Sequence, residues 1–240
     1  MNSLYIGASG LYATNESLTL TASNLANAAS PGFLAQRSVM ASFPNGTVAR
    51  TAPGPVVIGG AAEGVAMMDT VNTGQSPVVP SGQMTDLALS GNGFFQVQTP
   101  SGIAYTRDGR FTRNAQGQLV TAGGDRVLGR NGQPLVVGTG PFTVDTKGNV
   151  SRGTTPIGQL ALASLPAQGL KSVGQNLYQS ATPKAYAGQV QQGAYNASGV
   201  NLAQQAVDLM QAEGRYQALA QSVNVSSGQL KSATSLGLLA

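Results

Sequence analysis

The side chains of this chain that could do chemistry are its nine carboxylates. Two carboxylates held a few ångströms apart can hydrolyse a glycosidic bond, but Glu16, Glu63, Glu213 and the six aspartates do not cluster in the sequence. Histidine and cysteine are absent, which excludes Ser-His-Asp and Cys-His nucleophiles and removes the commonest general base and metal ligand. We therefore predict that the protein is not an enzyme and has no catalytic, cofactor-binding or metal-binding residues.

Two other patterns have the residue types of a binding site. Closely spaced glycines occur in GASGLYA at residues 7–13 and in SGNGFF at residues 90–95. A P-loop needs a strand, a glycine-rich loop with Lys-Ser or Lys-Thr, and a helix; because these parts are missing, we interpret both stretches as turn glycines. The charges of Arg107, Asp108 and Arg110 fit either an intersubunit salt bridge or a solvated hairpin tip, since exposed pairs contribute only about 0–1 kcal/mol.

Charge is sparse along the chain. Charged residues make up 9% of it, the net charge is +4, and no basic run is interleaved with aromatics, so we expect no nucleic-acid partner and no small-molecule substrate. No apolar run approaches the ~20 residues of a membrane span. The first ten residues, MNSLYIGASG, lack the basic and apolar regions of a cleaved signal peptide. If the protein leaves the cytoplasm, we expect a different route.

The two ends of the chain share a seven-residue repeat that predicts helices. Leu4, Leu11, Leu18 and Leu25 form one series, and the second series is Leu202, Leu209, Tyr216, Val223 and Leu230. Such a repeat places one apolar stripe along a helix, as in a coiled coil. We predict helices over residues 3–28 and 200–235, the first ended by Pro31 and Gly32 and the second capped by Ser198.

The middle of the chain predicts extended structure. Residues 34–80 are rich in Gly, Pro and Val and indicate a linker or extended arm that has room for a few strands. Residues 81–182 alternate strand and turn signals and predict a compact all-β domain. Asp108-Gly109 predicts a hairpin turn between AYTR and RFTR, and weaker turn signals end at Gly117 and Asn149. Residues 183–197 are a return segment.

The predicted fold class is α+β. Its long N- and C-terminal helices form a coiled-coil-like helical domain, beside a central all-β domain and an extended linker arm. The predicted divisions are 1–33, 34–80, 81–182, 183–197 and 198–240. Two narrow stripes bury little surface by themselves. The two helices could pair with each other and take further helices from other copies of the chain; the alternative is that the N-terminal helix packs on the chain's own β domain.

Five stretches, in this order, resemble the rod and hook proteins of the bacterial flagellum. They are TASNLANAASPGF (21–33), DLALSGNGFFQV (86–97), AYTRDGRFTRNAQGQLVTAGGDRVLG (104–129), SVGQNLY (172–178) and SGVNLAQQAVDLMQAEGRYQA (198–218). The chain looks most like the proximal rod members of that family, with distal rod members as the alternative. It departs from the family pattern at Gly199, at Gly214 and at Ser-Ser-Gly 226–228.

The resemblance implies a structural subunit of the basal-body rod, the drive shaft across the periplasm that serves motility. Its implied partners are other rod proteins, copies of itself and the type III export apparatus, which exports it without a cleaved signal peptide. The terminal helices would form an inner tube. The implied subunit-interface residues are Leu4, Leu11, Leu18, Asn24, Leu25, Asn27, Leu202, Leu209, Tyr216, Val223 and Leu230. A β-rich secreted binding module with terminal helices is the alternative from another functional class.

Overall fold

The structure, a computed structural model, describes residues 2–43, 57–58, 64–74, 76–167 and 169–237. The side chains of residues 2–6, 8, 38–43, 57–58, 64–70, 230–231 and 233–237 lie outside this description. The chain divides into two compact units. The terminal unit comprises Met1–Ala26, Gln36–Thr70 and Asn201–Ala240, and the central unit comprises Asn27–Ala35 and Val71–Val200.

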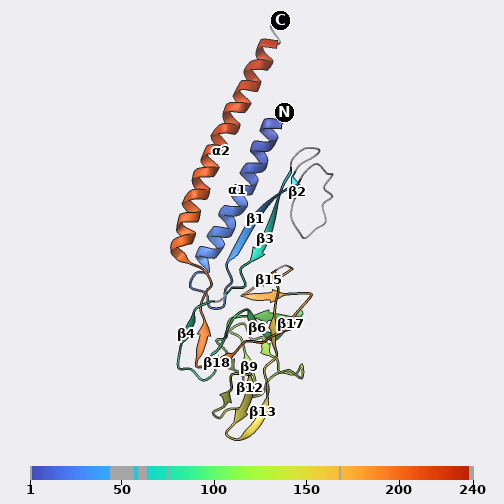
Figure 1. The fold of residues 1–240 in the computed structure, drawn as a ribbon, viewed down its shortest axis with the longest axis vertical. Coiled ribbons are helices and arrows are strands. Elements are labelled where there is room, and N and C mark those ends of the chain that lie inside the picture. The colour runs from blue at the N-terminus through green and yellow to red at the C-terminus, as the bar shows by residue number, and fades with distance from the viewer. Residues whose placement is uncertain (1, 44–56, 59–63, 75, 168, 238–240) are drawn as a thin grey trace. The chain divides into compact units, whose positions relative to one another are not determined.

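Two long helices dominate the terminal unit. Helix α1 spans Asn2–Ala26 and helix α2 spans Leu202–Gly237. They run antiparallel and side by side (Figure 1). Strand β1 (Gln36–Phe43) contacts α1 and belongs to a three-stranded sheet in the order β1-β3-β2, completed by β3 (Gly64–Val71) and β2 (Val57–Ile58). The unit therefore joins both ends of the chain to a small sheet.

The described part of the central unit is built from short strands. These are β4 (Val78–Pro80), β5 (Leu87–Leu89), β6 (Gly93–Thr99), β7 (Gly102–Thr106), β8 (Thr112–Arg113), β9 (Leu119–Val120), β10 (Arg126–Val127), β11 (Thr143–Val144), β12 (Asn149–Arg152), β13 (Thr155–Gln159), β14 (Leu162–Ser164), β15 (Lys171–Gly174), β16 (Leu177–Gln179), β17 (Lys184–Ala185), β18 (Val190–Gln192) and β19 (Ala194–Asn196).

A nine-stranded sheet organises these strands. Its main path is β15-β16-β7-β6-β10-β9-β8, and β14 joins it by pairing with β6 and with β17. Strands β11, β12 and β13 form a second sheet, while β18 pairs with β5 and β19 pairs with β4. The last two pairings join the strands before the large sheet to those that lead into α2.

The large sheet is covered on both faces, as adjacent residues of β6 show. Phe94 belongs to one buried cluster and stacks edge-on against Tyr178, with ring centroids 5.9 Å apart. Phe95 belongs to another and stacks edge-on against Phe111 at 5.0 Å. Because successive side chains of a strand point to opposite faces, two buried neighbours require apolar cover on both sides.

The predicted fold class is wrong in its helical part. Over the described residues the chain is mostly β with two helices, and the central β domain is present. The coiled-coil-like domain is not found, and the predicted stripe of α2 is not a continuous buried seam: Leu202 is 57% and Tyr216 is 40% exposed. Within the described part of residues 34–80, residues 36–43 and 64–71 are sheet strands.

Two local predictions are also corrected. Asp108-Gly109 does not close a hairpin, because β7 pairs with β6 and β16 while β8 pairs with β9. Gly109 is required for a different reason: a Cβ there would lie 1.6 Å from the carbonyl oxygen of Leu87. The N-cap of α2 is Asn201 rather than Ser198, since Asn201 Oδ1 accepts from the Gln204 amide at 3.1 Å.

The two weaker turn predictions are confirmed. The amide of Gly117 donates to Asn114 O at 2.9 Å between β8 and β9. The amide of Gly148 donates to Asp145 O at 3.0 Å between β11 and β12. Both glycines have positive φ, at 71° and 80°, which L-residues rarely adopt and glycine adopts readily.

Candidate assembly surface

Helices α1 and α2 approach each other through glycines. A Cβ atom on Gly7 would lie 2.5 Å from Cγ2 of Val223, and one on Gly10 would lie 3.4 Å from a methyl carbon of Leu219. The first distance is too short for real carbon atoms, so the absence of a side chain at Gly7 permits the approach. Both glycines are helical, and their interpretation as turn glycines is wrong.

Small hydroxyl residues continue this face of α1. Thr14 and Thr21 follow Gly7 at seven-residue intervals and are only 5% and 7% exposed. Their hydroxyls donate to the carbonyl oxygens of Gly10 and Ser17, each at 2.8 Å. Because these bonds stay within α1, the hydroxyls are satisfied without a partner on α2.

Asn24 ends this face with a hydrogen-bond network. It is 2% exposed. Its Nδ2 donates to Gln36 O at 2.8 Å and to Gln205 Oε1 at 2.9 Å, and its Oδ1 accepts from the Gln36 amide at 2.8 Å. Gln205 Nε2 in turn donates to Asp208 at 3.2 Å. One side chain therefore connects α1, the start of β1 and the first turns of α2.

Asn27 lies in the turn that follows α1 and is partly buried. Its Oδ1 accepts from the Ser30 hydroxyl at 3.2 Å. In the same turn, Gly32 has a φ of 69°, and its amide donates to Asn196 O at 2.8 Å. A Cβ on Gly32 would lie 2.1 Å from the main-chain nitrogen of Asp108. The turn is thus held against distant parts of the central unit, and only glycine fits it.

The structure separates the predicted interface residues into groups. Asn24 is buried and bonded within its own chain. Leu202 and Tyr216 are exposed. The partly buried members are Leu11, Leu18, Leu25, Asn27, Leu209 and Val223. The side chains of Leu4 and Leu230 lie outside the described residues.

A second apolar surface on α2 was missed by the sequence analysis. Val207, Met210 and Val225 are 47%, 71% and 55% exposed. With Gly214 and Ala218, also exposed, they follow one another at intervals of three, four, four and seven residues and so lie on one side of the helix. That side is opposite the one that carries Gln205, Ala212 and Leu219. We call these five residues the outer stripe. The spacing of these residues is the sequence signal for this surface. The seven-residue leucine repeat of the same segment indicates a different side of the helix.

The charge cluster of the central unit is largely used within the chain. Arg107 is fully buried, and it donates to Thr73 O at 3.3 Å and to Gly91 O. Its guanidinium lies 6.0 Å from the centre of the Phe94 ring, and burial lowers its pKa. Asp108 pairs instead with Arg110 at 3.3 Å. Arg107 is therefore an internal link between loops rather than part of a solvated tip.

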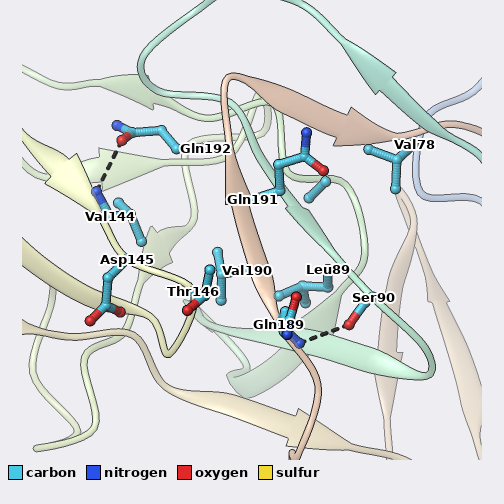
Figure 2. Close-up of a pocket in the computed structure, with 11 residues that line it drawn as sticks. Val78, Leu89, Ser90, Val144, Asp145, Thr146, Gln189, Val190, Gln191 and Gln192 are labelled. Atoms are coloured by element: carbon cyan, nitrogen blue, oxygen red, sulfur yellow. Dashed lines mark hydrogen bonds between the residues drawn. The ribbon is translucent and has the colours of Figure 1, made fainter.

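A cleft of about 570 Å³ in the central unit lies between β5, β18 and the turn after β11 (Figure 2). Its polar groups are held by the chain itself. The Val144 amide donates to Gln192 Oε1 at 3.0 Å, and the Gln189 amide donates to Ser90 Oγ at 2.7 Å. Over the described ranges no three His, Cys, Asp or Glu side chains gather to hold a metal ion.

Comparison with known proteins identifies the family. Residues 88–152 match the model "Flagellar hook protein FlgE/F/G D1 domain", and residues 191–236 match "Flagellar basal body rod FlgEFG protein C-terminal". The flagellar basal-body rod protein FlgF of Caulobacter vibrioides is 33% identical over 93% of this chain and 92% of its own length. The chain belongs to the flagellar basal-body rod family.

Further rod proteins match over nearly their whole length. FlgG of Buchnera aphidicola subsp. Schizaphis graminum is 31% identical, and FlgG of Bacillus subtilis is 27% identical, each over 98% of this chain and 99% of its own. Members of the rod family are structural proteins rather than enzymes, so the chain is a structural rod subunit of the flagellar basal body, as predicted. Neither helix, over its described residues, is apolar enough to span a membrane.

Proposed function

We propose that this rod protein is a subunit of the proximal rod that assembles helically with other rod proteins and copies of itself. The FlgF relative from Caulobacter vibrioides, 33% identical, supports the proximal assignment. FlgG relatives at up to 31–32% identity keep a distal rod position as the alternative. The rod would cross the periplasm and transmit torque to the hook.

The observation that carries this proposal is the outer stripe of α2. A helix whose second apolar face is open to solvent places unfavourable apolar surface in water. Leu202 and Tyr216, two of the sequence-predicted interface residues, are also exposed on α2. Because the chain belongs to the rod family, a neighbouring rod subunit is the partner that we expect to cover this face. We therefore propose that the outer stripe contacts neighbouring rod subunits.

The partly buried leucines of α1 and α2 act differently in this proposal. Leu11, Leu18 and Leu209 hold the terminal unit together and so present the stripe. Export is proposed to use the flagellar type III apparatus without a cleaved signal peptide. This route is compatible with a chain that lacks cysteine.

The test is Met210→Asp in a strain whose own copy of the gene is deleted. Met210 is 71% exposed, so the change should leave the free subunit folded. We expect loss of swimming in soft agar and absence of the variant from isolated basal bodies. Asn224→Asp, at an exposed position of the same helix that has no stripe residue three or four positions away, adds the same charge and should swim normally. Normal swimming of Met210→Asp, with the protein present in basal bodies, would exclude the stripe as an interface.

A further inference from the structure

The contact between α1 and α2 repeats along its length. Gly7 lies against Val223, Gly10 against Leu219 and Asn24 against Gln205. The residue numbers in these pairs add to nearly the same total, as expected for antiparallel helices in one register. Between these points α1 presents Thr14, Ser17 and Thr21 at intervals of three and four residues. Apart from the close approach at Gly7, packing between small residues repeated in this way distinguishes weakly between one register and another displaced by seven residues.

Asn24 adds a polar contact to this surface. Its amide is nearly fully buried and needs both of its acceptors and its donor. Gln205 supplies the acceptor on α2, and it is itself 8% exposed and bonded to Asp208. In a register displaced by seven residues, Ala212 would stand in the place of Gln205. An alanine cannot accept a hydrogen bond, so one Nδ2 proton of Asn24 would be buried without a partner. Such a loss is costly for a buried donor.

We propose that Asn24 and Gln205 are the residues that set the register of α1 against α2. The bond between them contributes specificity more than strength, as a buried asparagine does in other paired helices. This role is independent of the proposed place in the rod, because it concerns contacts within one subunit. It makes Asn24 a positioning residue, whose bonds to Gln36 also fix the start of β1 relative to the helix pair.

A disulfide reporter can measure the register directly. The chain has no cysteine, so an introduced pair reacts without competition. The Cβ atom of Val223 lies 3.9 Å from the position of a Cβ on Gly7, which is within the range for a disulfide. Gly7→Cys with Val223→Cys therefore reports the observed register. Gly7→Cys with Leu230→Cys reports the register displaced by seven residues.

The variant to test in both reporters is Asn24→Leu, which keeps most of the volume and removes the amide. The ratio of disulfide to dithiol is measured at equilibrium in a glutathione buffer. We expect the ratio for the 7–223 pair to fall by about tenfold and the ratio for the 7–230 pair to rise. Thr21→Val is the matched control. It removes a hydroxyl from the same face of α1 that bonds only within its own helix, so both ratios should stay within about twofold of the parent.

Gln205→Met provides a second variant that leaves the bonds between Asn24 and Gln36 intact. It should shift both ratios in the same direction as Asn24→Leu, and it decides the question if Asn24→Leu does not fold. Circular dichroism of each variant checks that the helices are present. The proposal is overturned if the 7–223 ratio is unchanged in the variants. It is equally overturned if that ratio falls while the 7–230 ratio does not rise, because this would mean general loosening rather than a change of register.

Discussion

The side-chain amide of Asn196 is hydrogen-bonded to both main-chain groups of Leu89, which is 107 residues away in the sequence. Its Oδ1 accepts from the Leu89 amide at 2.8 Å, and its Nδ2 donates to Leu89 O at 2.9 Å. Asn196 is fully buried. Its amide takes the place of a peptide group on a neighbouring strand, and Asn24 pairs with Gln36 in the same way.

We expect Asn196→Ala to lower the free energy of unfolding of the central unit by about 1–3 kcal/mol, because it leaves two buried groups of Leu89 without partners. Asn196→Asp should also be destabilising, since a carboxylate cannot donate to Leu89 O. Urea unfolding measures both. Asn92→Ala, at an exposed position, is the control and should change stability by less than about 0.5 kcal/mol. Equal effects at the two positions would contradict the role given to Asn196.

Alanine substitutions at Gly32 and Gly82 distinguish the cost of a steric clash from the cost of backbone strain. Their φ angles are 69° and 70°, so alanine at either position meets the same backbone strain of about 1–2 kcal/mol. At Gly32 a Cβ would also lie 2.1 Å from Asp108 N, whereas at Gly82 no atom lies within 4 Å. We expect Gly82→Ala to fold with a modestly lowered melting temperature and Gly32→Ala to be severely destabilised. Thermal unfolding of the pair tests this, and matching melting temperatures would refute the close contact.

A second glycine pair tests the helix contact. Replacing glycine by alanine favours a helix by about 1 kcal/mol, and at Gly214 no atom within 4 Å opposes the new methyl group. Gly214→Ala should therefore stabilise the terminal unit by about 1 kcal/mol. Gly7→Ala has the same intrinsic gain, but its Cβ would lie 2.5 Å from Val223, so we expect net destabilisation. Helix signal during thermal unfolding is the measurement; stabilisation by both changes would show that α1 and α2 are less closely packed at Gly7.

Asp145 gives the chain a pH-dependent turn. The Asn149 side-chain amide donates to it at 2.7 Å, and this bond, with those from the Asn149 and Lys147 main chain, holds its pKa below the ordinary 3.8. A pKa that is lower in the folded chain contributes stability above about pH 3.8, and the contribution is lost as the pH falls through the folded pKa. The Asn149 side-chain resonances should therefore titrate with a midpoint below 3.8.

Asn149→Ala tests whether the Asn149 side chain causes the lowered pKa of Asp145. It removes the largest cause of the lowered pKa, so the midpoint of the Asp145 carboxyl carbon should move up toward 3.8. A parent midpoint at or above the ordinary value would rule out the hydrogen bonds described for this turn.

The helix positions were predictable because they depend on local signals. Predicted helices over 3–28 and 200–235 compare with Asn2–Ala26 and Leu202–Gly237. The surfaces by which these helices meet were only partly predictable from apolarity. Val223, a member of the second apolar series, lies at the contact, but its partner on α1 is Gly7, which the leucine repeat does not mark and whose missing side chain allows close approach. A stripe of leucines marks where apolar surface is, not which neighbour covers it.

Pairing between distant residues was the other missing information. The signal at Asp108-Gly109 fitted a hairpin locally, but β7 finds its partners in β6 and β16, and the latter lies about seventy residues further along the chain. The importance of Asn196 had no local signal, since its role depends on the main chain of Leu89. The same holds for Asn24: its burial becomes understandable only when Gln36 and Gln205 are seen beside it.

The bond between Asn24 and Gln205 also has a consequence for the order of events during protein synthesis. The two residues are 181 positions apart, and a ribosome adds about 5–20 residues per second. Asn24 therefore leaves the ribosome roughly 10 to 40 seconds before its partner exists. The central unit, whose last strands precede α2, can complete its sheets first. Every newly made subunit thus passes through a period in which the central unit can fold before α1 has α2 to pack against.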